Sequence, residues 1–155
     1  MKKIFVGIDV AKDSSNGHGL NAEGETLFSL AFTMNSEGFS KLLDELKSKS
    51  WDLSEVLVAM ESTACYHINL FSFLTANGVN AVVINPLLIS NFARLSLRKT
   101  KTDKKDASTI AQFAMIQDTV EYIVQHVITV PMHGGLLSML QITCSPKHCR
   151  ERQSL

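Results

Sequence analysis

Short apolar runs and stretches with helical spacing follow one another along the chain. The first apolar run, Ile4 to Val10, is rich in β-branched residues and almost continuously hydrophobic, which favours a strand covered on both faces. Residues 18–20 and 25–33 predict two further strands, because turn-forming residues at 21–24 separate them. Three antiparallel strands are therefore expected to open the fold, with residues 13–17 as the first turn.

Helical spacing appears next. From about Ser36, apolar residues recur at positions typical of a helix that packs on a sheet, namely Phe39, Leu42, Leu43 and Leu46. A second helix is expected after Ser62-Thr63, which can cap it, and Asn77-Gly78 stops it.

Two more apolar runs, residues 56–60 and 79–84, have the length and composition of buried strands. Residues 87–97 are expected to form a short helix or an ordered loop, and a last helix follows with Ile110, Phe113 and Ala114 facing inward. This order predicts an α/β protein with a mixed five-stranded sheet and helices on both faces.

Composition restricts the class of protein. A length of 155 residues suits one ordinary domain, and 45% hydrophobic against 19% charged residues excludes a largely disordered chain. The first apolar run meets an acid too early for a signal peptide, and no stretch reaches the roughly 18 apolar residues of a membrane span. We therefore expect a cytoplasmic protein. Three cysteines do not match a disulfide framework.

Charge is concentrated in one segment although the net charge is zero. Residues 94–105 contain one acid, Asp103, and six basic residues: Arg94, Arg98, Lys99, Lys101, Lys104 and Lys105. A local excess of positive charge attracts phosphate groups. These six side chains are candidates for contact with a nucleic-acid backbone.

Four carboxylates interrupt or follow the predicted elements. Asp9 interrupts the first buried strand, and Glu61 follows directly after the fourth. Asp103 and Asp106 share one face if a helix starts near Asp103. Each has a structural alternative, since Asp103 can cap the helix, Asp106 can oppose its dipole, and Asp9 can cap the following turn.

The four acids can converge because ligands gather at the carboxyl ends of strands. A carboxylate in a central strand costs several kcal/mol unless it is paired or bound to metal. Carboxylates about 4 Å apart repel by roughly 1 to 4 kcal/mol per pair at surface-like dielectric. We therefore expect a hard cation, and two Mg²⁺ or Mn²⁺ ions are the arrangement that cleaves phosphodiesters.

Four segments carry a resemblance to a known family: Gly7 to Lys12, Met60 to Tyr66, Val83 to Pro86, and Lys101 to Ala107. In order and spacing they resemble the DEDD transposases of bacterial insertion sequences, which include the Piv-type DNA invertases and the bridge-RNA-guided recombinases. The resemblance implies a RuvC-like, ribonuclease-H-like domain over residues 1–117. It also implies that Asp9, Glu61, Asp103 and Asp106 form the metal-binding tetrad.

The chain departs from the family at two points. Ala64 stands where the family commonly has glycine. Family members continue into a second domain with a serine nucleophile, which nothing in residues 118–155 resembles. These residues lose periodicity after a stretch that can extend the last helix to about Ile128. We interpret them as a divergent tail of a truncated element.

The leading hypothesis is the metal-dependent catalytic domain of a DNA transposase or recombinase, unable to recombine DNA alone. The resemblance implies DNA as partner, a guide RNA in some members, and homo-oligomers in the full-length family. A RuvC-like junction resolvase or ribonuclease would share the tetrad chemistry. An actin-like ATPase or sugar kinase also opens with Gly-Ile-Asp, but Val10 to Lys12 lacks the glycine its phosphate loop needs. The fourth alternative is a non-catalytic remnant that only binds nucleic acid or dimerises.

Overall fold

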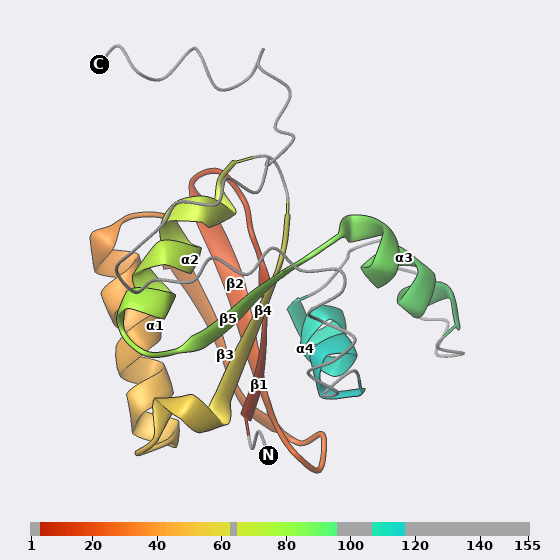
Figure 1. The fold of residues 1–155 in the computed structure, drawn as a ribbon, viewed down its shortest axis with the longest axis horizontal. Coiled ribbons are helices and arrows are strands. Elements are labelled where there is room, and N and C mark those ends of the chain that lie inside the picture. Colours follow the sequence, from red (N-terminus) through yellow and green to blue (C-terminus); the bar gives the residue numbers. More distant parts are fainter. Residues whose placement is uncertain (1–3, 63–64, 96–106, 117–155) are drawn as a thin grey trace, which may run out of the picture.

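A computed structural model describes residues 4–62, 65–95 and 107–116 of the chain. In this part, one sheet has helices on both of its faces (Figure 1). The strands are β1 (Ile4–Asp9), β2 (Ser14–Asn21), β3 (Thr26–Thr33), β4 (Val56–Glu61) and β5 (Asn80–Ile84). The helices are α1 (Ser36–Lys49), α2 (His67–Ala76), α3 (Pro86–Leu95) and α4 (Ala107–Ile116), with a 3-10 turn η1 (Leu53–Glu55) before β4.

The sheet is mixed, with the strand order β3-β2-β1-β4-β5. β2 runs antiparallel to both β1 and β3, whereas β1, β4 and β5 run parallel to one another. The predicted fold class is thereby confirmed, and the arrangement is compatible with a ribonuclease-H-like fold. The predicted domain boundary at residue 117 and the tail 118–155 lie outside the described residues.

One face of the sheet packs against α1 and α2. Its strand residues alternate with those of the other face because successive side chains in a strand point to opposite sides. Val6, Ile8 and Val58 on this face form one buried cluster with Leu42 and Leu46 of α1. The helical stripe predicted from Phe39 to Leu46 is therefore the face that α1 buries.

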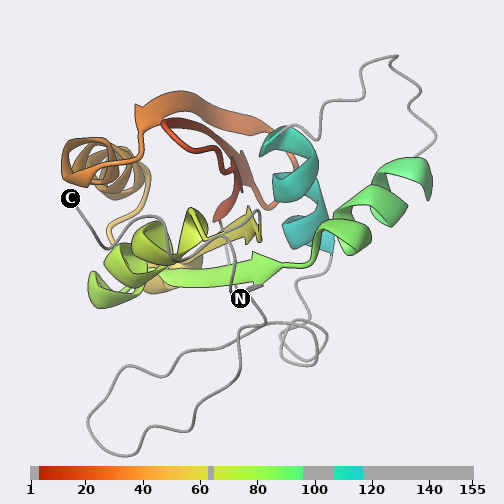
Figure 2. The ribbon, with the colours of Figure 1, turned by 90° about the horizontal axis from the view of Figure 1, so that it is seen from above.

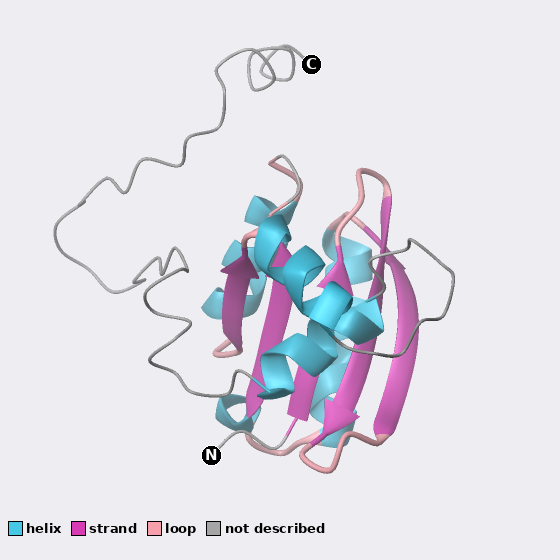
Figure 3. Cartoon of the chain, turned by 90° about the vertical axis from the view of Figure 1, so that its right-hand side faces the viewer, coloured by secondary structure: helices cyan, strands magenta, loops and turns pink. Residues whose placement is uncertain are grey.

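The opposite face packs against α3 and α4, as the view from above shows (Figure 2). Phe5 and Leu57 of the strands join Ile110, Phe113 and Ala114 of α4 in a second buried cluster. The inward orientation predicted for these three α4 residues is confirmed. Figure 3 faces this side of the molecule and shows helices crossing in front of the strands.

Two local predictions were wrong. Ser14 to Gly17 form the first half of β2 instead of a turn, because pairing with β1 outweighs the turn preference of these residues. Helix α2 starts only at His67, with Tyr66 before it and no side-chain cap, so Ser62 does not cap it. Residues 87–97 were left open between helix and loop, and α3 accounts for those up to Leu95.

Helix α1 starts one residue after a capping side chain. Asn35 Oδ1 accepts a hydrogen bond from the Gly38 backbone N–H at 2.9 Å, which satisfies a donor that the helix itself leaves unpaired. Lys47 and Lys49 lie in the last turn, where positive charge opposes the helix dipole favourably. Over the described ranges, the structure contains no helix that is both long and apolar enough to cross a membrane.

Candidate active site

Asp9 and Glu61 lie side by side where the parallel strands of the sheet end. We call this rim of the sheet, at the carboxyl ends of β1 and β4, the acidic edge. They are the last residues of β1 and β4, two parallel strands in which Ile8 is the register partner of Met60. Carried forward by one residue, this register makes the two acids neighbours on strands about 4.8 Å apart. The two acids are therefore register neighbours at the carboxyl ends of adjacent parallel strands.

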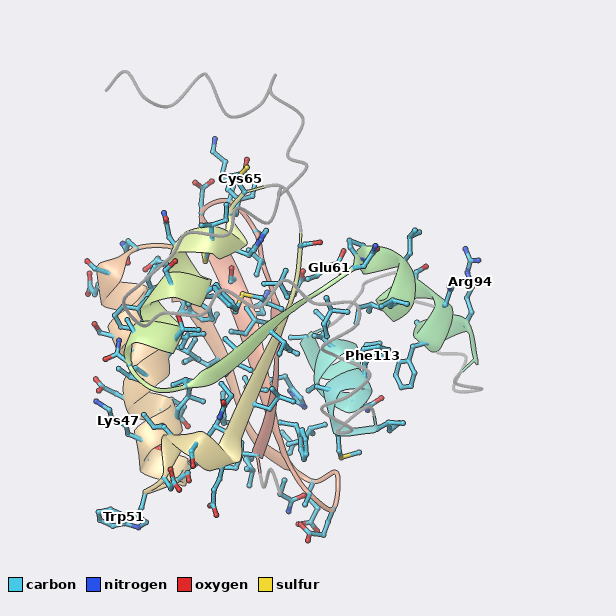
Figure 4. All side chains as sticks on the ribbon, viewed as in Figure 1. Lys47, Trp51, Glu61, Cys65, Arg94 and Phe113 are labelled. Carbon is cyan, nitrogen blue, oxygen red and sulfur yellow. The ribbon has the colours of Figure 1, made fainter. Side chains whose placement is uncertain are left out.

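Both acids face the α3/α4 side of the sheet. Like Phe5 of β1 and Ala59 of β4, they occupy odd-numbered positions and therefore point to the same side of the sheet. Phe5 and Ala59 belong to the buried cluster on that side. Glu61 is 6% exposed and Asp9 is half-buried. Figure 4 shows the Glu61 side chain leaving the end of β4 towards α3 and α4. The edge therefore presents two carboxylates in a partly enclosed position.

Hydrogen bonds hold the backbone immediately beyond each acid. The Ser62 N–H donates to the Ile84 carbonyl oxygen at 3.1 Å, which continues the pairing of β4 with β5 past Glu61. After Asp9, the Ala11 N–H donates to Ser15 Oγ at 3.2 Å, and Ser15 is only 1% exposed. Both acids are thus attached to a backbone that is fixed on either side of them.

Helix α4 lies unusually close to β1. A Cβ atom built on Gly7 would be 2.1 Å from the Ala107 carbonyl oxygen and 2.3 Å from the Ala111 nitrogen, far inside van der Waals contact. Ala107, Ala111 and Ala114 are all buried, so the helix presents small side chains over this strand. Glycine in β1 and alanine in α4 together allow the two backbones to approach.

The N-terminal end of α4 points towards the edge that carries the acids. Ala107, its first residue, lies against Gly7, two residues before Asp9. At the other end of the helix, Met115 is within 3.6 Å of a Cβ built on Gly24, in the turn between β2 and β3. That turn is at the amino end of β1, since Ile4 is the register partner of Asn21.

The predicted tetrad is placed only in half. Asp103 and Asp106 lie outside the described residues, so their convergence with the other two acids stays a prediction. Within the described part, no group of three or more histidine, cysteine, aspartate or glutamate residues is arranged to hold a metal ion. The pair that is present, Asp9 and Glu61, offers the oxygen ligands that Mg²⁺ and Mn²⁺ prefer.

Of the six residues predicted to contact nucleic acid, the structure describes one, Arg94. Arg94 is exposed in the last turn of α3 and points away from the body of the molecule (Figure 4). The other five candidates lie outside the described residues: Arg98, Lys99, Lys101, Lys104 and Lys105.

The sequence-based interpretation missed the residues that shape this edge. Gly7 was interpreted as part of an apolar strand and of a family motif, but not as a site of close backbone approach, which an isolated glycine in a strand often marks. Ser15 and Asn16 were assigned to a turn, whereas the structure pairs their strand with β1. The alanines at 107, 111 and 114 were a usable signal, because small residues at helical spacing allow close packing.

Known proteins match the same part of the chain. The family model DEDD_Tnp_IS110, described as a transposase, matches residues 6–129. Over 113 residues the chain is 28% identical to the pilin gene-inverting proteins of Moraxella lacunata and Moraxella bovis, covering 73% of the chain and 34% of each relative. It is also 28% identical over 115 residues to the uncharacterized 44.8 kDa protein of insertion element IS116 from Streptomyces clavuligerus, covering 74% of the chain and 28% of that protein.

The chain spans about a third or less of the length of these relatives. Among solved structures, it is similar to Pelota from Archaeoglobus fulgidus, with a TM-score of 0.39 and 17% identity over 81% of this chain and 38% of that one, which is too low to support any inference. The family match covers most of the 155 residues and includes both acids of the described edge. The chain belongs to the IS110 family of DEDD transposases.

Proposed function

We propose that this chain supplies the metal-dependent catalytic domain of a DNA transposase or recombinase that acts on phosphodiesters. The observation that carries the proposal is the pair Asp9 and Glu61 at the carboxyl ends of neighbouring parallel strands. Family membership favours this reading over a junction resolvase or a ribonuclease. The Moraxella relatives are named as gene-inverting proteins, which supports DNA as the substrate.

The position of α4 supports a larger set of acids. Asp106 immediately precedes Ala107 in the sequence, and consecutive Cα atoms are about 3.8 Å apart. Ala107, the first residue of α4, packs on Gly7, which precedes Asp9 by two residues, so the described start of α4 lies near the acids. We propose that Asp9 and Glu61 hold divalent ions together with Asp103 and Asp106.

Divalent ions bound by such carboxylates supply Lewis-acid stabilisation of the charge that develops on a phosphate under attack. The chain itself contributes the fixed direction of the carboxylates, because Ser62 and Ser15 hold the backbone beyond them. A rigid set of ligands restricts the geometry in which a phosphodiester is bound, which favours reaction by positioning.

The basic residues are proposed to bind the DNA backbone without reading its sequence. Arg94 is exposed on α3. This helix begins directly after Asn85, which follows the carboxyl end of β5, so it starts at the same end of the sheet as the acids. The proposed contact set is Arg94, Arg98, Lys99, Lys101, Lys104 and Lys105. Binding of a guide RNA and homo-oligomerisation remain predictions from the family resemblance.

A nicking assay tests the catalytic proposal. Purified chain is incubated with supercoiled plasmid and Mg²⁺ or Mn²⁺, with a chelator in a parallel reaction. We expect conversion to the nicked form that requires the metal and is lost in Glu61→Gln. Glu45→Gln, which changes a partly exposed glutamate of α1, is the matched control and should nick normally. DNA binding without metal-dependent nicking would favour the non-catalytic alternative.

Recombination is a separate question. No segment of this chain resembles the serine-bearing domain that the family resemblance implies, so we expect this chain, when tested alone, to nick DNA without strand exchange. A covalent nucleophile divides one difficult step into two easier ones, and the acids of the proposed metal site cannot replace it. Recombinant product from this chain alone, with donor and target DNA, would contradict this expectation.

A further inference from the structure

Asn16 extends the row of polar residues at the acidic edge. It lies in β2, where its register partner on β1 is Asp9. Residues directly opposite each other in an antiparallel pair project to the same face, with Cβ atoms about 4.5 to 5.5 Å apart. Asn16, Asp9 and Glu61 therefore cross β2, β1 and β4 side by side on the α3/α4 face.

No structural role of the Asn16 side chain is seen in the described part of the fold. Asparagine is depleted in strands, and this one is exposed. Five other asparagines hold a turn, a helix end or a neighbouring backbone through side-chain hydrogen bonds: Asn21, Asn35, Asn77, Asn80 and Asn85. Asn16 makes no such bond within the described part of the chain. Its amide is therefore available to a ligand at this edge.

We propose that the Asn16 side-chain amide donates a hydrogen bond to a non-bridging oxygen of the DNA phosphate that is held beside Asp9. This inference rests on the proposed function, because it places the phosphate at the carboxylate edge. An amide carries two N–H donors and no charge. It can bind an anion without adding to the negative charge of the neighbouring acids, which a carboxylate at the same position would do.

The position of Asn16 also separates its role from that of the basic residues. Lysine and arginine contacts to the DNA backbone contribute to DNA binding whether or not metal is present. A contact beside Asp9 acts on a phosphate that reaches the metal site. The informative quantity is therefore the gain in DNA affinity on adding Mn²⁺, measured as the ratio of the dissociation constants without and with the ion.

The experiment compares wild type with Asn16→Ala, Asn16→Asp and Asn80→Ala. Asn80 is a matched control because it is also an exposed strand asparagine, but it lies at the first position of β5, at the opposite end of the sheet. Each protein is titrated with Mn²⁺ alone by calorimetry and with a short duplex DNA by fluorescence anisotropy, with and without Mn²⁺. Gels check the duplex for cleavage, and thermal melts check the fold.

In Asn16→Ala we expect the Mn²⁺-dependent gain in DNA affinity to fall by about tenfold, the size of one hydrogen bond to a charged group. Affinity for Mn²⁺ alone should be unchanged. Asn16→Asp should lose more of the gain, because its carboxylate repels the phosphate. Asn80→Ala should melt earlier and keep the full gain.

Two results would overturn the inference while leaving the proposed function in place. An unchanged gain in Asn16→Ala would remove the phosphate contact, and weakened binding of Mn²⁺ alone in the same variant would make Asn16 a metal ligand instead. Absence of Mn²⁺ binding to the wild-type chain would overturn the proposed function, and this inference with it.

Discussion

The two faces of the sheet differ in what they bury and in how they end. Among the described residues, 18 belong to the buried cluster under α1 and α2, and eight belong to the cluster under α3 and α4. The larger cluster reaches the carboxyl ends of β1 and β4 with Ile8 and Met60, whereas the other face ends there in Asp9 and Glu61. Adjacent residues in the same strands thus contribute to the core on one side and present carboxylates on the other.

Among the described residues, each face also contains one glycine at a close backbone contact. A Cβ on Gly38 of α1 would be 1.9 Å from the Thr33 carbonyl oxygen, just as a Cβ on Gly7 would meet Ala107. The consequences differ because Gly38 joins α1 to the end of β3, while Gly7 joins α4 to β1 two residues before Asp9. We infer that only the second contact is coupled to the candidate site.

The largest expected loss of stability comes from the α1/α2 face. Leu46 is fully buried in α1, and Leu46→Ala should lower the free energy of unfolding by about 2 to 5 kcal/mol, because the cavity collapses only in part. Denaturant titration measures this loss. The folded variant should bind Mn²⁺ as the wild type does, and weakened binding would show that the two faces are not separable in this way.

The pair Gly7→Ala and Gly38→Ala tests the coupling of α4 to the site. Each added methyl group should cost about 1 to 3 kcal/mol of stability through overpacking. In Gly38→Ala about 1 kcal/mol is recovered from helix propensity. Calorimetry should show weaker Mn²⁺ binding in Gly7→Ala and unchanged binding in Gly38→Ala.

Equal Mn²⁺ affinities in the two glycine variants would separate α4 from the metal site. Denaturant titration of both proteins under the same conditions is the control, because it establishes that each is folded during the calorimetric measurement.

The sequence predicted the elements whose pattern is local. Strand β1, helix α1 and the inward residues of α4 follow from hydrophobic periodicity, and Glu61 was expected where a buried strand ends. Ser14 to Gly17 were mistaken for a turn because their local preference opposes the strand that pairing with β1 imposes. The contact of Gly7 with Ala107 joins residues a hundred positions apart, and no local pattern reveals which helix will cover a strand.

Only part of the candidate site could be predicted from the sequence in this way. Asp9 and Glu61 could be found because a carboxylate in an apolar run is costly without a ligand. Asn16 could not, since it stood in a segment read as a turn and becomes a neighbour of Asp9 only through strand register. The basic residues were identified by charge density alone, which locates a segment but not the direction of its side chains.

Substitutions in the basic segment should weaken DNA binding in small steps, whereas loss of one acid should weaken metal binding sharply. If the basic segment neutralises about four phosphates, the logarithm of the association constant for duplex DNA should fall with the logarithm of salt concentration at a slope of roughly −3.6. Replacing Lys99, Lys101, Lys104 and Lys105 by alanine should flatten this slope and leave Mn²⁺ binding unchanged. A salt-independent affinity, or a slope that the four replacements do not alter, would remove the assignment.

The most direct test of the proposed metal site is calorimetric titration with Mn²⁺, and its variants are expected to change stability the least. The proteins to compare are the wild type, Asp9→Asn, Glu61→Gln and, as a control at an exposed position of α1, Asp44→Asn. The account predicts that the wild type and the control bind Mn²⁺ equally. Asp9→Asn and Glu61→Gln should bind at least about tenfold more weakly, since each loses a charged oxygen ligand. Asp9→Asn should remain folded with equal or slightly higher stability, because repulsion between like charges falls. Unchanged Mn²⁺ affinity in Asp9→Asn would contradict the metal site.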